Sequence, residues 1–351
     1  MDGAARRWFD SHTFDAAQFQ AAELIGAKQR SGQTVSVVIP ARNEAATVAA
    51  VVSQIRQALL VSGLVDELIV LDSDSTDDTA AVARAAGAAV FAARDIDTGT
   101  PLSPGKGEAL WKSLFVTSGD LLVFIDADLT EWGPHFVTGL LGPLLSQELS
   151  EERSDEGILL TKGFYDRLAD DLPADPAAAL PQGGRVTELV ARPLLNLYWP
   201  ELAAVVQPLA GEWAVRRSLI ESLPIPVGYG VEFASLTDTW RQHGLPAIAQ
   251  VDLGRRGHRH QNVHDLGVMA AEILATAMRR LPVGTMAASL PAEAHLPSEP
   301  GPPSEAGLPS LQQYDRNAPQ GWRSRPVPVA ERPPARTNQR YPNRTATRCS
   351  S

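Results

Sequence analysis

Two acids, Asp126 and Asp128, stand one residue apart directly after the apolar run at residues 121–125. Two carboxylates this close repel each other unless positive charge lies between them, and a hard divalent cation that carries diphosphate oxygens supplies such charge. The ordinary alternative is a strand end with two solvated acids in a turn. Because the repulsion between the two carboxylates requires such a cation, we hypothesise a site for a metal and a diphosphate at this point of the chain.

The same two acids permit a second chemistry. Residues 126–130 read Asp-Ala-Asp-Leu-Thr, which fits the D-x-D-x-T signature of haloacid-dehalogenase-like phosphatases, with Asp126 as nucleophile and Asp128 as general acid. Such phosphatases normally carry this signature on their first strand, whereas three predicted strands precede it here. The position favours a nucleotide pocket and leaves the phosphatase as the alternative.

Lys106 is the first basic group that could bind a phosphate. It stands between Gly105 and Gly107 at the start of a predicted helix, where free amides and the helix dipole add to its charge. The segment is not a Walker A motif, because Gly99 lies six residues before Gly105 and Gly107 stands where Ser or Thr should follow the lysine. A flexible glycine loop is the alternative explanation.

Two further segments carry groups for anions or metals. Gly184, Arg185 and Thr187 offer amides, a guanidinium and a hydroxyl to an anionic acceptor, unless they form an ordinary loop before a helix. The densest basic cluster of the chain contains Arg255, Arg256, His258, Arg259, His260 and His264. It is either a solvated turn or the source of a histidine that completes a metal site begun by two aspartates.

Short apolar runs predict the strands that position these groups. They lie at residues 35–39, 67–71, 88–92, 121–125, 158–165 and 247–253. Helical segments alternate with them, which predicts an α/β fold with a mostly parallel sheet and helices on both faces. Asn43, Glu44 and Ser73 then follow the first two strands, at the sheet edge where such folds bind ligands.

Composition narrows the class of protein. The 351 residues carry a net charge of -10, from 31 basic and 41 acidic side chains, which argues against nucleic acid as a partner. No apolar run reaches the roughly 18 residues that span a bilayer. We expect a cytoplasmic enzyme, because the first residues show no secretory signal pattern. The single cysteine, Cys349, excludes intrachain disulfides and cysteine metal clusters.

Taken together, these pieces resemble the glucosyl-3-phosphoglycerate synthases of actinobacteria, a family of retaining GT-A glycosyltransferases (family 81). The resemblance spans roughly residues 34–282 and is carried by segments 35–44, 66–73, 104–111, 184–195 and 207–212. The first three segments are shared by many GT-A enzymes. The last two are far more specific to this family.

The resemblance implies a GT-A fold with a Rossmann-like nucleotide-binding half. It implies transfer of glucose from UDP-glucose, or less readily GDP-glucose, to the 2-hydroxyl of 3-phosphoglycerate with retention at the anomeric carbon. Mg2+ would assist, with Mn2+ or Co2+ as substitutes, and the chain would be a homodimer. The implied organisation is an N-terminal arm (1–33), a nucleotide-sugar-binding half (34–165) and an acceptor-binding half with a closing helix (166–290). Twelve of the 27 prolines fall in residues 291–351, which we expect to be a disordered tail.

The resemblance also implies roles for individual residues. The uridine or diphosphate would be contacted by Pro40, Ala41, Glu44, Ser73, Lys106 and Ala127. Asp128 and His258 would ligate the metal beside Asp126, and Arg256 with Lys106 would stabilise the leaving diphosphate. Tyr229 and Glu232 would hold the glucose. The phosphoglycerate would be bound by Gly184, Arg185, Val186, Thr187 and His260.

Three positions depart from the family pattern. Ala127 replaces the usual serine between the two acids, where the flanking carboxylates carry the chemistry. Arg42 replaces an apolar residue beside the nucleotide loop and bears on base preference, and His260 replaces an acceptor-contacting asparagine. Glu232 is the one candidate for a nucleophile on the opposite face of the sugar, and we favour same-face attack instead.

Overall fold

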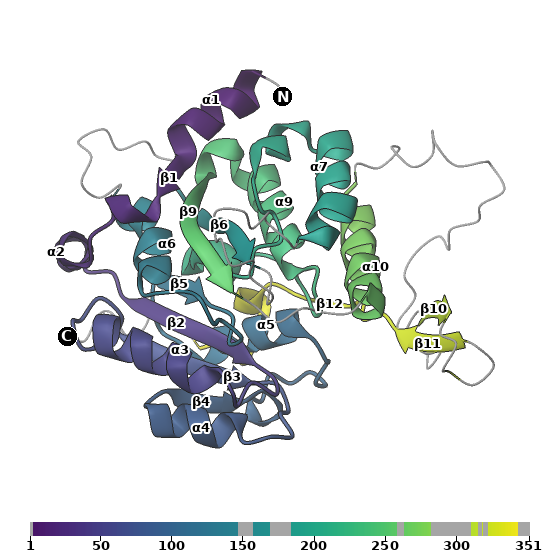
Figure 1. Ribbon diagram of the computed structural model, residues 1–351, viewed down its shortest axis with the longest axis horizontal. Coiled ribbons are helices and arrows are strands. Elements are labelled where there is room, and N and C mark those ends of the chain that lie inside the picture. Colours follow the sequence, from purple (N-terminus) through teal and green to yellow (C-terminus); the bar gives the residue numbers. More distant parts are fainter. Residues whose placement is uncertain are drawn as a thin grey trace, which may run out of the picture.

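The computed structural model describes residues 3–146, 157–168, 184–257, 263–281, 310–314, 318 and 322–342. Within these ranges, eight strands form one sheet in the order β1-β9-β6-β7-β5-β2-β3-β4 (Figure 1). In chain order the strands are β1 (Thr13–Asp15), β2 (Val35–Ala41), β3 (Glu67–Asp72), β4 (Ala89–Ala92), β5 (Leu121–Phe124), β6 (Leu160–Leu168), β7 (Trp213–Arg216) and β9 (Ile248–Gly257).

The helices lie between these strands and beside the sheet. They are α1 (Gly3–His12), α2 (Ala21–Ser31), α3 (Val48–Ile55), α4 (Thr79–Ala86), α5 (Lys106–Val116), α6 (His135–Ser146), α7 (Arg192–Tyr198), α8 (Arg217–Ile220), α9 (Val231–His243) and α10 (Val263–Arg280). None of the helices in the described part of the chain is long and apolar enough to cross a bilayer.

The sheet is mostly parallel, which confirms the predicted fold class. Strand β2 pairs in parallel with β3 and β5, and β3 pairs in parallel with β4. Strand β7 was not predicted, and it lies antiparallel between β5 and β6. Its sequence, Trp-Ala-Val-Arg, ends in an arginine and lacks the longer apolar run that marked the predicted strands, so pairing on both sides defines it.

Alternate residues of the central strands face two separate cores, as a two-sided sheet requires. Val37 of β2 and Val123 of β5 belong to one core, which α3 and α6 cover. Val38 and Phe124 belong to the other, to which α5, α9 and α10 contribute. Both faces of the central strands are therefore buried, which explains their nearly continuous apolar sequences.

The N-terminal residues form part of the sheet as well as packing on it. Strand β1 pairs in parallel with β9 at the sheet edge, and Trp8 of α1 donates a hydrogen bond of 2.8 Å from Nε1 to the Ile248 carbonyl oxygen. Both predicted halves, 34–165 and 166–290, contribute strands to the same sheet.

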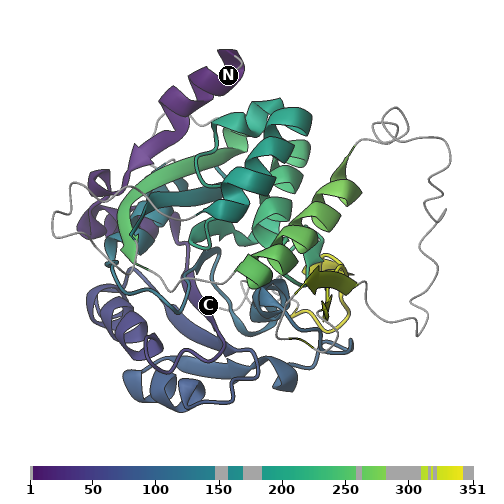
Figure 2. The same cartoon turned by 45° about the vertical axis from the view of Figure 1, so that its right-hand side comes forward.

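The prediction of disorder across residues 291–351 is wrong for residues 310–314 and 322–342. Strand β12 (Glu331–Arg332) pairs antiparallel with β8 (Ile225–Pro226), and Ala335 is fully buried. A hairpin of β10 (Ser310–Tyr314) and β11 (Trp322–Pro326) lies against α10 (Figure 1 and Figure 2). Proline-rich composition was misleading here, because the ordering contacts come from residues distant in sequence.

Candidate active site

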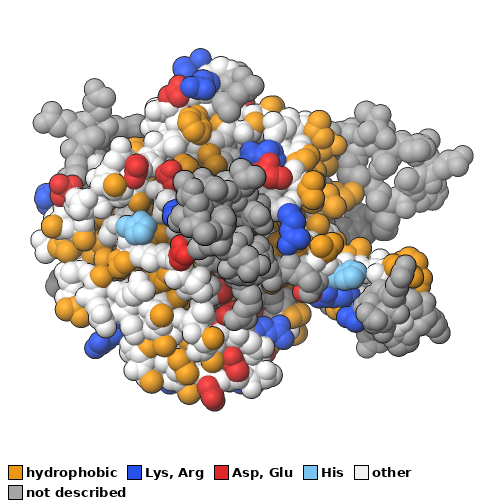
Figure 3. All heavy atoms as spheres, viewed as in Figure 1, with side chains coloured by type: hydrophobic (Ala, Val, Ile, Leu, Met, Phe, Trp, Pro, Cys, Tyr) orange, Lys and Arg blue, Asp and Glu red, His pale blue; other side chains and the backbone are white. Residues whose placement is uncertain are grey.

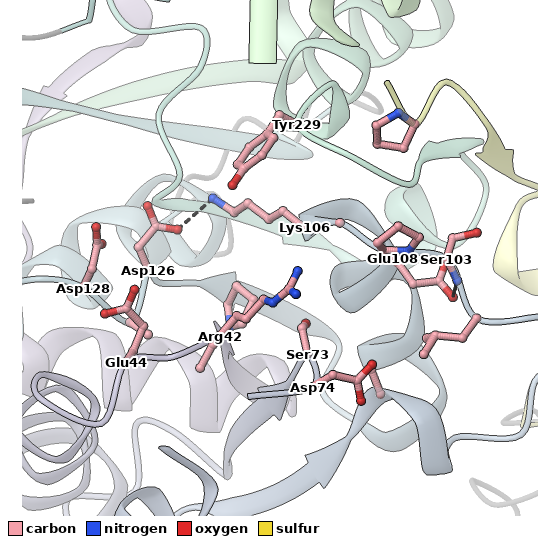
Figure 4. Close-up of a pocket in the computed structure, with 18 of the residues that line it drawn as sticks. Arg42, Glu44, Ser73, Asp74, Ser103, Lys106, Glu108, Asp126, Asp128 and Tyr229 are labelled. Atoms are coloured by element: carbon pink, nitrogen blue, oxygen red, sulfur yellow. Dashed lines mark hydrogen bonds and ion pairs between the residues drawn. The ribbon is translucent and has the colours of Figure 1, made fainter. Parts of the chain in front are cut away.

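A cavity of about 570 Å³ opens at the carboxyl ends of β2, β3 and β5, the edge at which open α/β sheets bind ligands. Its lining brings together residues from both ends of the chain (Figure 4). The lining residues are Pro40, Ala41, Arg42, Glu44, Ser73, Asp74, Ala93, Leu102, Ser103, Pro104, Gly105, Lys106, Glu108, Asp126, Ala127, Asp128, Tyr229, Pro326 and Pro328.

The loops after β2 and β3 are tied to each other, and this fixes the entrance of the cavity. Asn43 adopts a left-handed conformation (φ 59°), and its Oδ1 accepts a hydrogen bond of 2.8 Å from the Thr76 amide. The Glu44 amide donates to Thr79 Oγ1 at 2.8 Å, and the Ala45 amide donates to Asp77 Oδ2 at 3.2 Å. Asn43 and Asp77 therefore serve the loops, while Glu44 and Ser73 line the cavity.

Asp126 lies between two cations at the end of β5. Its Oδ1 accepts from Lys106 Nζ at 2.7 Å (Figure 4), and its Oδ2 accepts from Arg256 Nη2 at 3.0 Å. Burial alone would raise the pKa of Asp126, but the charges of Lys106 and Arg256 outweigh it and hold that pKa well below its usual range. Asp126 is thus an anion held in one orientation.

Arg256 supplies positive charge between the two acids. Its Nη2 also donates to Asp128 Oδ1 at 3.1 Å, and its Nη1 donates to Tyr165 Oη at 2.7 Å. Burial lowers the pKa of Arg256, but the surrounding carboxylates raise it more strongly. The net pKa therefore lies well above its usual value. The side chain is only 4% exposed and does not line the cavity, so it lies behind the acids.

Lys106 begins α5 and reaches across the cavity floor. Besides Asp126, its Nζ lies 2.8 Å from Glu232 Oε1. Burial lowers the pKa of Lys106, but the charges of Asp126 and Glu232 raise it by more than burial lowers it. The net pKa therefore lies well above its ordinary value. Lys106 is therefore a permanent cation that cannot act as a base near neutral pH.

The glycines around Lys106 serve backbone packing, which the sequence did not indicate. A Cβ on Gly107 would lie 1.8 Å from the Pro226 carbonyl oxygen. The Gly107 amide donates to the Gly228 carbonyl at 3.2 Å, and the Glu108 amide donates to that of Val227 at 2.8 Å. These two amides are already bonded, so the predicted group of free amides at this helix start is reduced.

Tyr229 and Glu232 come from the segment that begins α9. Tyr229 lines the cavity beside Lys106 (Figure 4), whereas Glu232 is 4% exposed and is not part of the lining. The Tyr229 amide donates to Glu272 Oε2 of α10 at 2.6 Å. Burial raises the pKa of Glu272 to about 7.

Two charged groups behind the acids have no role assigned from the sequence. Glu212 is fully buried, with its Oε1 3.4 Å from Arg256 Nη2, and burial raises its pKa. Lys162 donates to the Ala210 carbonyl at 2.8 Å, and burial lowers its pKa to about 8. Glu212 lies in the family-specific segment 207–212, which was the one available signal for it.

The remaining predicted residues either are not in the cavity lining or fall outside the described ranges. Gly184, Arg185, Val186 and Thr187 do not line the cavity, and Val186 and Thr187 are buried. His258 and His260 fall outside the residues that the structure describes. Sequence reasoning missed Leu102, Ser103, Pro104, Pro326 and Pro328 in the lining, because nothing in their types marks them as binding residues.

The donor set suits a hard divalent cation. The Asp128 carboxylate lines the cavity and is 30% exposed, so its oxygens face the space that a diphosphate would occupy. Among the described residues no cluster of three or more His, Cys, Asp or Glu side chains is arranged to hold a metal. The Asp128 carboxylate is of the type that such an ion prefers, and the second predicted ligand, His258, lies outside the described residues.

Comparisons with known proteins agree with this geometry. The family model described as Glycosyl transferase family 2 matches residues 36–148. A glucosyl-3-phosphoglycerate synthase of Mycobacterium tuberculosis is 51% identical over 258 residues, which cover 74% of this chain and 76% of the relative.

Solved structures of the synthase from the same organism are also similar. One is a complex with Mn2+, uridine-diphosphate-glucose and phosphoglyceric acid, and another contains Mn2+, uridine-diphosphate and glucosyl-3-phosphoglycerate. Both match this chain with a TM-score of 0.72 and 43% sequence identity, and each match covers 91% of this chain. The matches cover 95% of the solved chain in the first complex and 96% in the second. The haloacid-dehalogenase-like alternative is thereby set aside, because the chain belongs to the glucosyl-3-phosphoglycerate synthase family.

Proposed function

We propose that this chain transfers glucose from UDP-glucose to the 2-hydroxyl of 3-phosphoglycerate. The observation that carries the proposal is the convergence of Asp126, Asp128 and Lys106 in one cavity at the carboxyl end of β5. The family relationship supports the identity of both substrates, since relatives hold uridine-diphosphate-glucose and phosphoglyceric acid.

The donor is assigned to the cavity. Pro40, Ala41, Glu44 and Ser73 would contact the uridine, with Ala127 beside them and Lys106 toward the diphosphate. Arg42 also lines the cavity at this end, so the choice between UDP-glucose and GDP-glucose is proposed to depend on it. Comparing turnover of the two donors by the parent chain and by Arg42→Leu tests this assignment.

Asp128 would hold Mg2+, or Mn2+ or Co2+ in its place, together with His258. When bound, the cation would neutralise charge on the diphosphate as the bond from C1 to its leaving oxygen breaks. Lys106 is already charged and oriented, so it stabilises the same developing charge without reorganising. Arg256 contributes by holding Asp126 and Asp128 in place.

The acceptor is assigned to Gly184, Arg185, Val186 and Thr187, together with His260 as the resemblance implies. An arginine and backbone amides suit the phosphate and carboxylate of 3-phosphoglycerate. We further propose retention by same-face attack of the acceptor hydroxyl. Glu232 supports this choice, because its carboxylate is 5% exposed and bound to Lys106 and so is poorly placed to attack C1.

We also propose that the chain acts in the cytoplasm as a homodimer. Figure 3 shows hydrophobic side chains gathered on the visible face over α7 and α10. Leu274 and Met278 of α10 are 42% and 48% exposed, and Tyr314 and Trp322 of the adjoining hairpin are 57% and 56% exposed. A second copy would cover these side chains. Light scattering of the full chain that gives the mass of a monomer would contradict the dimer.

One assay tests the reaction. UDP release should require both UDP-glucose and 3-phosphoglycerate in the presence of a divalent cation. Release of phosphate from phosphoglycerate without a nucleotide sugar would instead indicate a phosphatase. Tight binding of UDP-glucose without turnover on any acceptor would indicate a binding protein.

A further inference from the structure

Residues 326–341, here called the C-terminal clamp, run along one wall of the cavity. Pro326 and Pro328 belong to the cavity lining, although they lie about 200 residues from Asp126. In Figure 4 the ribbon of this part of the chain passes beside the cavity, near Glu108 and Ser103.

Arg332 is the central contact of the clamp. Its Nε donates to Glu108 Oε2 at 2.6 Å and its Nη2 donates to Glu108 Oε1 at 2.9 Å, so the pair is bidentate. The guanidinium also lies 5.3 Å from the centre of the Trp111 ring. Glu108 is 1% exposed and stands two residues after Lys106 in the first turn of α5. A buried carboxylate requires positive charge nearby, and Arg332 supplies the closest such charge, with Lys112 Nζ 4.0 Å from Glu108 Oε1.

The clamp also holds the loop that leads into Lys106. Arg332 Nη2 donates to the Pro101 carbonyl at 2.5 Å and to Ser103 Oγ at 3.2 Å. Asn338 Nδ2 donates to the Thr98 carbonyl at 3.0 Å, and Arg340 forms an ion pair with Asp97. Loop 97–105 is therefore tied to the clamp at both of its ends.

The opposite side of the clamp reaches the segment that carries Tyr229. Strand β12 pairs with β8, and the Val227 amide donates to the Ala330 carbonyl at 3.0 Å. Because the Gly107 amide donates to the Gly228 carbonyl, the start of α5 and the Tyr229 segment form one unit with the clamp. A shift of the clamp would move Lys106 and Tyr229 together.

We propose that the C-terminal clamp is part of the donor site and that Arg332 is a positioning residue for Lys106. Arg332 holds Glu108 and loop 97–105, so that Lys106 meets the diphosphate in one orientation and the wall at residues 102–104 encloses the nucleotide sugar. This inference rests on the proposed transfer from UDP-glucose. It assigns a function to the segment that composition marked as disordered.

The test compares Arg332→Ala, Arg332→Lys and Glu108→Gln with the parent chain. Arg336→Ala is the matched control, because Arg336 is an exposed arginine of the same clamp and its substitution removes the same charge. Michaelis constants for UDP-glucose and for 3-phosphoglycerate are measured separately, with the melting temperature. Hydrogen exchange of the amides in residues 97–108 is measured on the free protein.

We expect Arg332→Ala to lower kcat/KM for UDP-glucose roughly 10- to 100-fold, because small misplacements of a catalytic group have effects of this size. KM for 3-phosphoglycerate should stay within about twofold of the parent value, as for an interaction confined to the donor. Arg332→Lys should recover part of the loss, and Arg336→Ala should behave as the parent. Hydrogen exchange of the amides in residues 97–108 should be faster in Arg332→Ala than in the parent chain, and unchanged in Arg336→Ala.

Each other result overturns the inference. Unchanged donor kinetics in Arg332→Ala would remove the positioning role. Equal rises in both Michaelis constants with a lower melting temperature would make the clamp a structural brace only. If Arg332→Ala fails to fold, Glu108→Gln and Arg332→Lys must reproduce the donor-specific loss. A parent chain without turnover would reject the proposed function, while the exchange measurement would still decide whether Arg332 holds the loop.

Discussion

Gly211 lies so close to Asp126 that a Cβ on Gly211 would stand 2.3 Å from Asp126 Oδ2. The carboxylate cannot easily yield, because Lys106 and Arg256 hold it on both oxygens. Gly211→Ala should therefore displace Asp126 and lower kcat/KM about 100-fold. Steady-state kinetics check this, and Gly3→Ala, a substitution at an exposed helical glycine, should leave the rate unchanged. Parent-like turnover in Gly211→Ala would show that the position of Asp126 is unimportant.

Lys106→Met should lower kcat roughly 100- to 1,000-fold, the usual effect of removing one preorganised charge from a transition state. The substitution also leaves Asp126 and Glu232 without their shared cation. Lys28→Met is the control, since Lys28 makes a similar 2.7 Å ion pair with Asp66 at the opposite edge of the sheet. It should reduce the melting temperature and spare kcat, whereas an equal kcat loss in both variants would refute a specific role for Lys106.

Asp128→Ala should abolish turnover that depends on a divalent cation. Its carboxylate is the described side chain proposed to bind the ion, and treatment of the parent chain with a chelator should have the same effect, reversed by added Mg2+. Binding of Mn2+ can be followed by its paramagnetic resonance signal, which requires no activity. Asp120→Ala, at the opposite end of β5, should bind Mn2+ as the parent does. If Asp128→Ala keeps metal-dependent turnover, the proposed organisation of the site is wrong.

Glu272 should make stability depend on pH near neutrality. Its folded-state pKa of about 7 exceeds the ordinary value of 4.5, so between these values the folded chain keeps a proton that the unfolded chain has released. The resulting stabilisation is complete below pH 4.5 and is lost as the pH rises through about 7. Glu272→Gln lacks this dependence, and its oxygen can still accept from the Tyr229 amide.

Urea unfolding of Glu272→Gln and of the parent chain, at pH values on both sides of 7, measures this effect. The variant should gain stability relative to the parent as the pH rises across that range. Glu23→Gln, at an exposed glutamate of α2, should show no such gain. A difference between Glu272→Gln and the parent that does not change with pH would exclude Glu272 as the titrating group.

Glu232→Gln should lower the activity, although Glu232 forms no covalent intermediate with the glucose in the parent chain. The carboxylate pairs with Lys106, so its removal disturbs the cation that meets the diphosphate. Mass spectrometry of the parent chain incubated with UDP-glucose alone should show no hexose attached to the protein. A hexose adduct on Glu232 would establish a nucleophile and replace same-face attack.

Much of the fold follows from short stretches of sequence. The apolar runs predicted β2, β3, β4 and β5, and the structure confirms them. For β2, β3 and β5 the reason is that a strand buried on both faces must be almost continuously apolar, whereas β4 is partly exposed. The same local logic placed Asp126 and Asp128 at the carboxyl end of β5 and Lys106 at the start of α5.

The tertiary structure decided which groups those acids and that lysine meet. Arg256 stands 130 residues after Asp126, and only the register of β9 beside β6 brings its guanidinium between the two carboxylates. Arg332 reaches Glu108 across 224 residues through the pairing of β12 with β8, in a segment whose prolines predicted disorder. Local sequence determines where a strand ends and which residue follows it, but charge compensation and enclosure depend on long-range pairing that no local pattern encodes.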